Sequence, residues 1–159
     1  GLAWSPKRIT LSTVGILPGL ERFLQESKCN LAISLHFPYS EVRAAYMPAE
    51  KAYPLSDVFS LVKQYDWSGQ RRISFEYTMF DGVNDSISDA DHLAKMIKGI
   101  PCRVNLIPYH SIPDVKVLPS KAETMTEFMR RLEKYNITTT IRRSRGQDIE
   151  AACGMLSKI

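Results

Sequence analysis

Cys153 is the residue of this sequence whose surroundings most favour covalent chemistry. It follows a basic cluster of three arginines (Arg142, Arg143 and Arg145) in the stretch IRRSRGQDIEAACG, residues 141–154. Positive charge and a position near a helix N-terminus both lower the pKa of a thiol and favour the nucleophilic thiolate. An apolar stripe on the same predicted helix would instead make Cys153 a filler of the core. The pattern alone leaves both interpretations open.

Few other residues form a recognisable reactive group. His36 ends a predicted strand, but no second histidine or cysteine lies at metal-ligand spacing, so the sequence predicts no metal site of its own. The three cysteines (Cys29, Cys102 and Cys153) are odd in number and far apart, which argues against a disulfide framework. Neither a glycine-rich phosphate loop nor a nucleophile elbow is present. The turn-rich DGVNDS of residues 81–86 is predicted to bond its own backbone.

Length and composition bound the class of protein. The 159 residues, 44% of them hydrophobic, are enough for one domain with a core. No apolar run reaches the roughly 18 residues that a membrane span needs, and no secretion signal is visible. Free thiols then suit a cytoplasmic protein without membrane contact. The net charge of +4 is mild, but local basic pairs such as Arg71-Arg72 could meet phosphate groups.

Short β-type runs alternate with amphipathic helical segments along the chain. This order favours parallel strands joined by right-handed crossovers, an α/β fold. Ser120 and Glu123 have the spacing of a helix capping box, and the polar, proline-containing stretch 37–54 is predicted to be an elaborated loop. The predicted helices begin near Pro18, Ser56, Ser88 and Ser120. The predicted strands are residues 9–13, 31–36, 73–80, 103–109 and 137–142.

The strands alternate apolar and polar residues, which predicts one face packed on helices and one polar face. Glu76 in the middle of a strand is the clearest case, because an unpaired buried carboxylate would be costly. A barrel with a ligand-holding lumen has such a face, and so does an open sheet with one wet face. Because five parallel strands are too few to close a barrel, the sequence predicts an incomplete, partial (β/α) barrel. Sites in such folds lie beyond the carboxyl ends of the strands.

Five motifs occur in order along nearly the whole chain: RITLSTVG, LAISLHFPYSEVR with a following MP, FEYTMFDGVND, CRVNLIPY and IRRSRGQDIEAACG. Together they resemble the C-terminal part of the radical S-adenosylmethionine (SAM) RNA methyltransferases. Members of that family methylate C2 of one adenine in 23S ribosomal RNA and of an adenine beside the tRNA anticodon. The resemblance implies that residues 1–159 are the C-terminal part of a (β/α)6 radical SAM barrel domain with its C-terminal extension.

The resemblance also implies which residues contact SAM. Ser12 matches a SAM-contacting serine, and Ser34, Leu35 and His36 match a SAM-contacting strand end. His110 falls at the last contact, where the family usually has asparagine, and an imidazole can still donate or accept one hydrogen bond there. The stretch PAEKAYP departs from the family's more usual Pro-Ile-Asn-Lys.

Cys153 aligns with the family's cysteine that receives a methyl group from SAM. The implied chemistry also needs a second SAM on a [4Fe–4S] cluster, whose CxxxCxxC ligand loop is expected upstream of Gly1 because Cys29 and Cys102 lack that spacing. The chain alone is therefore predicted to bind no cluster and to be inactive. The strand 9–13 is predicted to be a sheet edge that another chain covers.

The partners that the resemblance implies are 23S rRNA and tRNA, whose phosphates the arginine cluster would meet. Two alternatives stay open. One is the related enzyme that methylates C8 of the same ribosomal adenine. The other is a non-catalytic RNA-binding α/β module, which a sequence without an upstream CxxxCxxC loop would favour.

Overall fold

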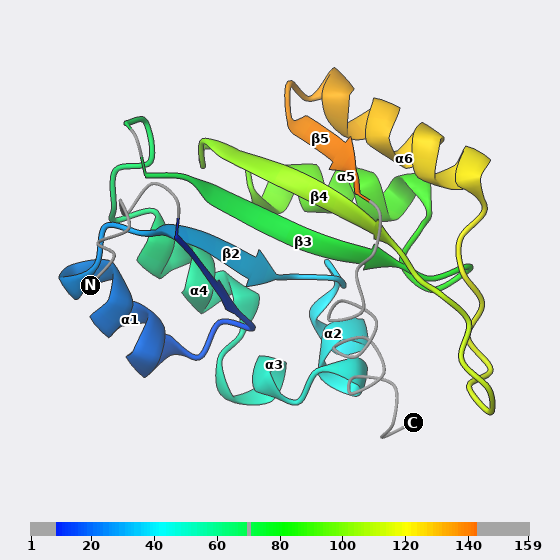
Figure 1. Ribbon diagram of the computed structural model, residues 1–159, viewed down its shortest axis with the longest axis horizontal. Coiled ribbons are helices and arrows are strands. Elements are labelled where there is room, and N and C mark those ends of the chain that lie inside the picture. The colour runs from blue at the N-terminus through cyan, green and yellow to red at the C-terminus, as the bar shows by residue number, and fades with distance from the viewer. Residues whose placement is uncertain (1–8, 70, 143–159) are drawn as a thin grey trace, which may run out of the picture.

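The computed structural model describes residues 9–69 and 71–142, which fold around a five-stranded sheet (Figure 1). The strands lie side by side in their sequence order, and every neighbouring pair is parallel. Repeated crossovers in one direction produce this order, and the predicted α/β class is confirmed. The sheet formed by the described residues is not closed. The strands are β1 (Thr10–Thr13), β2 (Asn30–Ser34), β3 (Ile73–Met79), β4 (Cys102–Pro108) and β5 (Thr138–Ile141).

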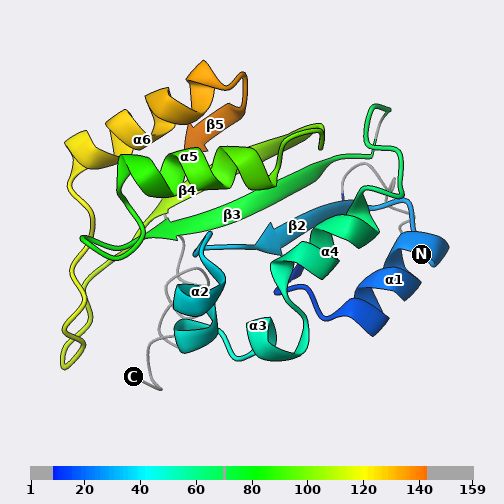
Figure 2. The same cartoon turned by 180° about the vertical axis from the view of Figure 1, so that it is seen from behind.

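Four helices join the strands and cover one face of the sheet (Figure 2). They are α1 (Leu17–Glu26), α4 (Leu55–Val62), α5 (Ile87–Met96) and α6 (Ala122–Lys134). Their apolar residues recur at helical spacing, for example Leu20 and Leu24 in α1 and Phe128 and Leu132 in α6, so each helix buries one stripe in a shared core against the strands. No helix within the described residues is long and apolar enough to cross a membrane.

The other face of the sheet is polar, as the alternation predicts. Ser34, Glu76, Asn105 and Thr140 are register partners across β2 to β5. Thr140 Oγ1 donates to Asn105 Oδ1 (2.7 Å), and Asn105 Nδ2 donates to Glu76 Oε1 (3.3 Å). Arg142 adds an ion pair, because its Nη2 lies 3.5 Å from Glu76 Oε2. The mid-strand carboxylate therefore has the partners that its burial requires.

The β1 edge of the sheet is exposed. Among the described strands β1 pairs only with β2, and its flanking Ile9 and central Leu11 are 42% and 37% exposed. The predicted open edge is thus present in the described part of the chain. Its cover by another chain stays a prediction.

Two helices begin close to, but not at, the predicted residues. The N-cap of α5 is Ser86 rather than Ser88: the Ser86 hydroxyl accepts a hydrogen bond from Asp89 N (3.0 Å), while the Asp89 carboxylate accepts one from Ser86 N (3.1 Å). This reciprocal pair satisfies two backbone N–H groups at the helix start. The helix α4 begins at Leu55, one residue before Ser56.

The predicted capping box of α6 is wrong. Lys121 is the N-cap of this helix, and no side chain caps it. The Ser120 hydroxyl instead donates to the carboxylate of Asp85 (2.8 Å), in the turn before α5. The Ser120 hydroxyl is therefore engaged in a tertiary hydrogen bond instead of a capping box with Glu123.

The stretch 37–54, predicted to be an elaborated loop, holds two short helices that the sequence did not predict. They are α2 (Ser40–Tyr46) and α3 (Ala49–Ala52). A second, smaller apolar cluster of Phe37, Met47, Phe80 and Tyr109 lies beneath them. The ring of Phe80 stacks on Phe37 (5.8 Å between centroids) and contacts Tyr109 (4.9 Å). Phe80 and Tyr109 directly follow β3 and β4, and Phe37 lies in the segment after β2. The cluster therefore packs the segments beyond the strand ends together.

Candidate cofactor-binding site

The predicted cofactor contacts lie toward the carboxyl ends of the parallel strands, which together form the carboxyl edge of the sheet. Ser12 is exposed on β1, Ser34 is half-buried at the end of β2, and His110 is exposed just after β4. Leu35 and His36 follow β2 and are buried. The Leu35 side chain belongs to the main core. Its backbone N–H donates to the Glu76 carbonyl, and its carbonyl accepts from Arg43 Nε. This edge is where ligands bind in parallel α/β folds.

His36 is held in an unusual conformation. Its backbone φ is +56°, in the left-handed region that non-glycine residues rarely occupy. Its ring Nδ1 accepts a hydrogen bond from the backbone N–H of Thr78 (2.8 Å), which places the proton of the neutral ring on Nε2. Burial, and then the nearby charge of Arg43, lower the pKa of His36 from 6.5 to about 3. The ring is therefore a neutral hydrogen-bond donor through Nε2.

Asn84 fixes the same segment from the side of β3. Its amide nitrogen donates to the carbonyls of His36 and Thr78 (2.7 Å each), and its amide oxygen accepts from Phe80 N (2.8 Å). Tyr77 in turn donates from its hydroxyl to the Asn84 carbonyl (2.5 Å). The predicted local bonding of DGVNDS is confirmed by the Phe80 contact, since an Asx side chain here binds backbone four residues away. The bonds across to β2 were not predicted.

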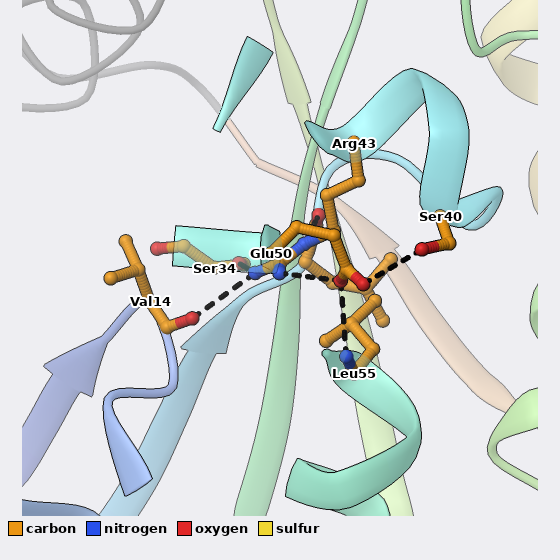
Figure 3. A network of polar contacts seen from close by, with 7 residues as sticks. Val14, Ser34, Ser40, Arg43, Glu50 and Leu55 are labelled. Atoms are coloured by element: carbon orange, nitrogen blue, oxygen red, sulfur yellow. Dashed lines mark hydrogen bonds and ion pairs between the residues drawn. The ribbon is translucent and has the colours of Figure 1, made fainter. Parts of the chain in front are cut away.

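Arg43 in α2 and Glu50 in α3 form a buried ion pair at this edge (Figure 3). Arg43 Nη1 lies 3.0 Å from Glu50 Oε1, and the two side chains are 0% and 2% exposed. The guanidinium also donates to three backbone carbonyls: Nε to Leu35 (3.0 Å), and Nη2 to Ser34 (3.0 Å) and Val14 (3.1 Å). Arg43 thus joins the segment after β1 to the end of β2.

Sequence reasoning missed this pair. Both residues lie in the stretch predicted to be a loop, where charged side chains are expected to face solvent. The signal available was the PAEKAYP stretch, which contains Glu50 and departs from the family pattern. Glu50 also accepts from Leu55 N (3.0 Å) at the start of α4 and from the Ser40 hydroxyl (2.9 Å) in α2. The stretch that departs from the family pattern therefore contains Glu50, the residue that orients Arg43.

The proposed thiol chemistry lies outside the described residues. Cys153, Arg143 and Arg145 are not among them, so their predicted roles stay predictions. The described cysteines, Cys29 and Cys102, are half-buried free thiols, and burial raises the pKa of Cys102 to about 12. Within residues 9–69 and 71–142, no three His, Cys, Asp or Glu side chains are grouped as metal ligands would be.

A cavity of about 470 Å³ opens at the opposite end of the strands. Its lining includes Arg72, Ser74, Arg103 and Asn105, all near the beginnings or middles of β3 and β4. None of the predicted cofactor contacts lines it. The cavity is therefore separate from the candidate site at the carboxyl edge.

The fold identifies the structural class of the protein. A crystal structure of a radical SAM methyltransferase from Sphaerobacter thermophilus superposes with a TM-score of 0.85 and 37% identity, covering 98% of this chain and 46% of that one. A domain of a pyruvate-formate lyase-activating enzyme from Bacteroides vulgatus shares the fold alone, with a TM-score of 0.65 and 17% identity over 84% of this chain and 81% of that chain. The described residues therefore have the α/β fold of radical SAM methyltransferases.

The names of the curated relatives specify the kind of methyltransferase more narrowly than the solved structures do. A protein from Porphyromonas gingivalis W83 is 55% identical over 157 residues, and a protein from Geobacillus kaustophilus is 44% identical; each is named a probable dual-specificity RNA methyltransferase RlmN. The matches cover 99% and 98% of this chain but 46% and 43% of the relatives, so the chain spans about half of their length. No family model matches. The chain is a homologue of a segment of these dual-specificity RNA methyltransferases, which confirms the resemblance found in the sequence.

Proposed function

We propose that the chain is the C-terminal, SAM-binding and methyl-carrying part of a longer RNA methyltransferase that modifies C2 of adenine in 23S rRNA and in tRNA. The observation that carries this proposal is the 55% identity over 157 residues to relatives named dual-specificity RNA methyltransferases. The exposed hydrogen-bonding groups at the carboxyl edge support it, because a polar cofactor needs such donors and acceptors.

In this proposal the strand ends bind SAM. Ser12 and Ser34 offer hydroxyl groups, and His36 offers a neutral Nε2–H that its contact with Thr78 orients. His110, exposed beyond β4, takes the place of the family's usual asparagine. Leu35 contributes by filling the core under the site.

Cys153 is the proposed methyl acceptor: its thiolate sulfur bonds the methyl carbon as the sulfonium–methyl bond of SAM breaks. A cluster-bound second SAM supplies the radical chemistry that an electron-poor adenine carbon requires. The present sequence contains no CxxxCxxC spacing, so the cluster ligands belong, in this proposal, to the remainder of the longer protein. Arg143 and Arg145 are proposed to contact RNA phosphates.

The decisive experiment expresses the longer protein in cells and measures two products by mass spectrometry. We expect a methyl group on the Cys153 peptide and methylated adenine in 23S rRNA and tRNA. Cys153→Ala should abolish both, whereas Cys102→Ala, at a half-buried thiol outside the site, should keep both. Methylated RNA made by the Cys153→Ala protein would refute the carrier role.

The same experiment fixes the position of the methyl group. 2-Methyladenosine and 8-methyladenosine separate in nucleoside chromatography, so a digest of the rRNA distinguishes C2 from C8 methylation. The first product supports the proposal, and the second assigns the chain to the C8-specific relatives. RNA that binds the protein without any methylation would favour a non-catalytic RNA-binding module.

A further inference from the structure

The buried Arg43–Glu50 pair has a geometry that packing alone does not require. Removing two charges from water is expensive, and apolar side chains of similar volume often replace a buried ion pair without loss of stability. Arg43 uses its planar donors on Glu50 and on the carbonyls of Val14, Ser34 and Leu35. A lysine ammonium is a point charge and cannot span these four acceptors in one plane.

The carbonyls that Arg43 binds belong to the segments that carry the proposed cofactor contacts. Val14 comes two residues after Ser12, and Ser34 and Leu35 directly precede His36. Figure 3 shows the Arg43 side chain reaching between the end of the first strand and the end of the second. One guanidinium group therefore bonds to both segments that carry the proposed contacts.

The segment after β2 is bound from two sides. On one side, the backbone N–H groups of Leu35 and His36 both donate to the Glu76 carbonyl (3.0 and 3.3 Å), and Asn84 holds the His36 carbonyl. On the other side, Arg43 holds the Leu35 carbonyl. A left-handed histidine costs free energy and persists where its surroundings enforce it. These opposed bonds enforce it here.

We propose that Arg43, oriented by Glu50, is a positioning residue for cofactor binding: it sets the backbone of residues 34–36 and of the segment after β1. The inference rests on the proposed function, in which this edge binds SAM. In this inference Arg43 acts on SAM binding through the geometry of its hydrogen bonds rather than through its charge. Substitutions at Glu50 can change the geometry and the charge of the pair separately.

Two substitutions separate geometry from charge. Glu50→Gln keeps the length of the side chain and the Oε1 acceptor for Arg43 and Leu55 but removes the charge, and the Ser40 hydroxyl can accept from the new amide. Glu50→Asp keeps the charge but draws the carboxylate back by one methylene. Glu26→Gln and Glu26→Asp are matched controls, because Glu26 pairs with Arg22 on the exposed face of α1.

The experiment uses the longer holoenzyme and measures the Kd of SAM by equilibrium dialysis, KM for SAM, kcat, and the midpoint of thermal unfolding. We expect Glu50→Asp to raise Kd and KM for SAM by about tenfold for each displaced contact, with a smaller change in kcat. Glu50→Gln should bind SAM nearly as well as wild type, although it unfolds at lower temperature. Both Glu26 variants should match wild type in every measurement.

The outcomes are distinguishable. If the wild type binds no SAM, the proposed function fails. In a second outcome the wild type binds SAM while Glu50→Gln raises the Kd of SAM more than Glu50→Asp does, or while neither variant raises it. Either result overturns the positioning role and leaves the proposed function standing. Should either Glu50 variant fail to fold, Arg43→Lys against Arg22→Lys decides: positioning predicts a raised KM for SAM in the first alone, and equal KM values overturn it.

Discussion

Acidification is expected to destabilise the protein through His36. The pKa of this residue is about 3 in the folded chain, against 6.5 for an ordinary histidine, because the buried ring resists protonation. The unfolded chain therefore binds a proton more readily than the folded chain between these two values. The stabilisation is fully present above the unfolded pKa and is lost as the pH falls from 6.5 toward 3.

The size of the effect follows from the two pKa values. If both states titrate fully, a depression from 6.5 to about 3 corresponds to roughly 5 kcal/mol of folding free energy. At about pH 5 the unfolded histidine is mostly protonated and the folded one is neutral, which leaves a loss of about 2 kcal/mol relative to about pH 7.5. That amount is a large part of the stability of an ordinary domain.

Urea unfolding at these two pH values tests the reasoning. Wild type should lose about 2 kcal/mol more than His36→Gln between about pH 7.5 and about pH 5, because the glutamine does not titrate. Wild type and His36→Gln share every other titratable group, so the difference between their losses isolates the contribution of His36. Equal losses in wild type and His36→Gln would refute the inference that His36 is held neutral by burial.

Three further changes test other parts of the structure. Asn84→Ala should cost about 3 kcal/mol in urea unfolding, because its three side-chain bonds to backbone groups are lost; a cost below about 1 kcal/mol would contradict this. Gly15→Ala should cost more than Gly99→Ala: both residues have positive φ, but the new methyl lies 3.0 Å from Val58 only in the first, and equal costs would exclude the clash. Cys102 should react far more slowly with iodoacetamide than a free thiol at about pH 8, because its pKa near 12 leaves little thiolate, and fast alkylation in the folded state would disprove its burial.

The sheet was predictable from the sequence because its signal is local. Alternation along 73–80 gives a polar Glu76 facing away from Phe75, and the structure places Phe75 in the core and Glu76 on the polar face. The order of the motifs along the chain then indicated the strands toward whose carboxyl ends Ser12, Ser34 and His110 lie. These features depend on residues close in sequence, or on register that the pleat imposes.

The details of the candidate site were not predictable, because they depend on contacts between distant segments. Ser120 has the pattern of a cap, yet Asp85, which is 35 residues away, takes its hydroxyl. Arg43 lies in a stretch predicted to be a loop, where a charged side chain is expected to face solvent, yet Val14, 29 residues earlier, supplies an acceptor for it. His36 with its left-handed backbone is likewise held by bonds to Thr78 in β3 and to Asn84 in the turn after it, which no local pattern encodes.

The second apolar cluster has a consequence for how the molecule opens. Phe37, Met47, Phe80 and Tyr109 pack together apart from the main core, so the segments beyond the strand ends have an interior of their own. Small separate clusters tend to unfold as local cooperative units below the global transition. The carboxyl edge can therefore exchange its amide hydrogens in sub-global openings while the sheet stays intact. Such an opening would break the hydrogen bonds that Arg43 makes from α2 to the end of β2.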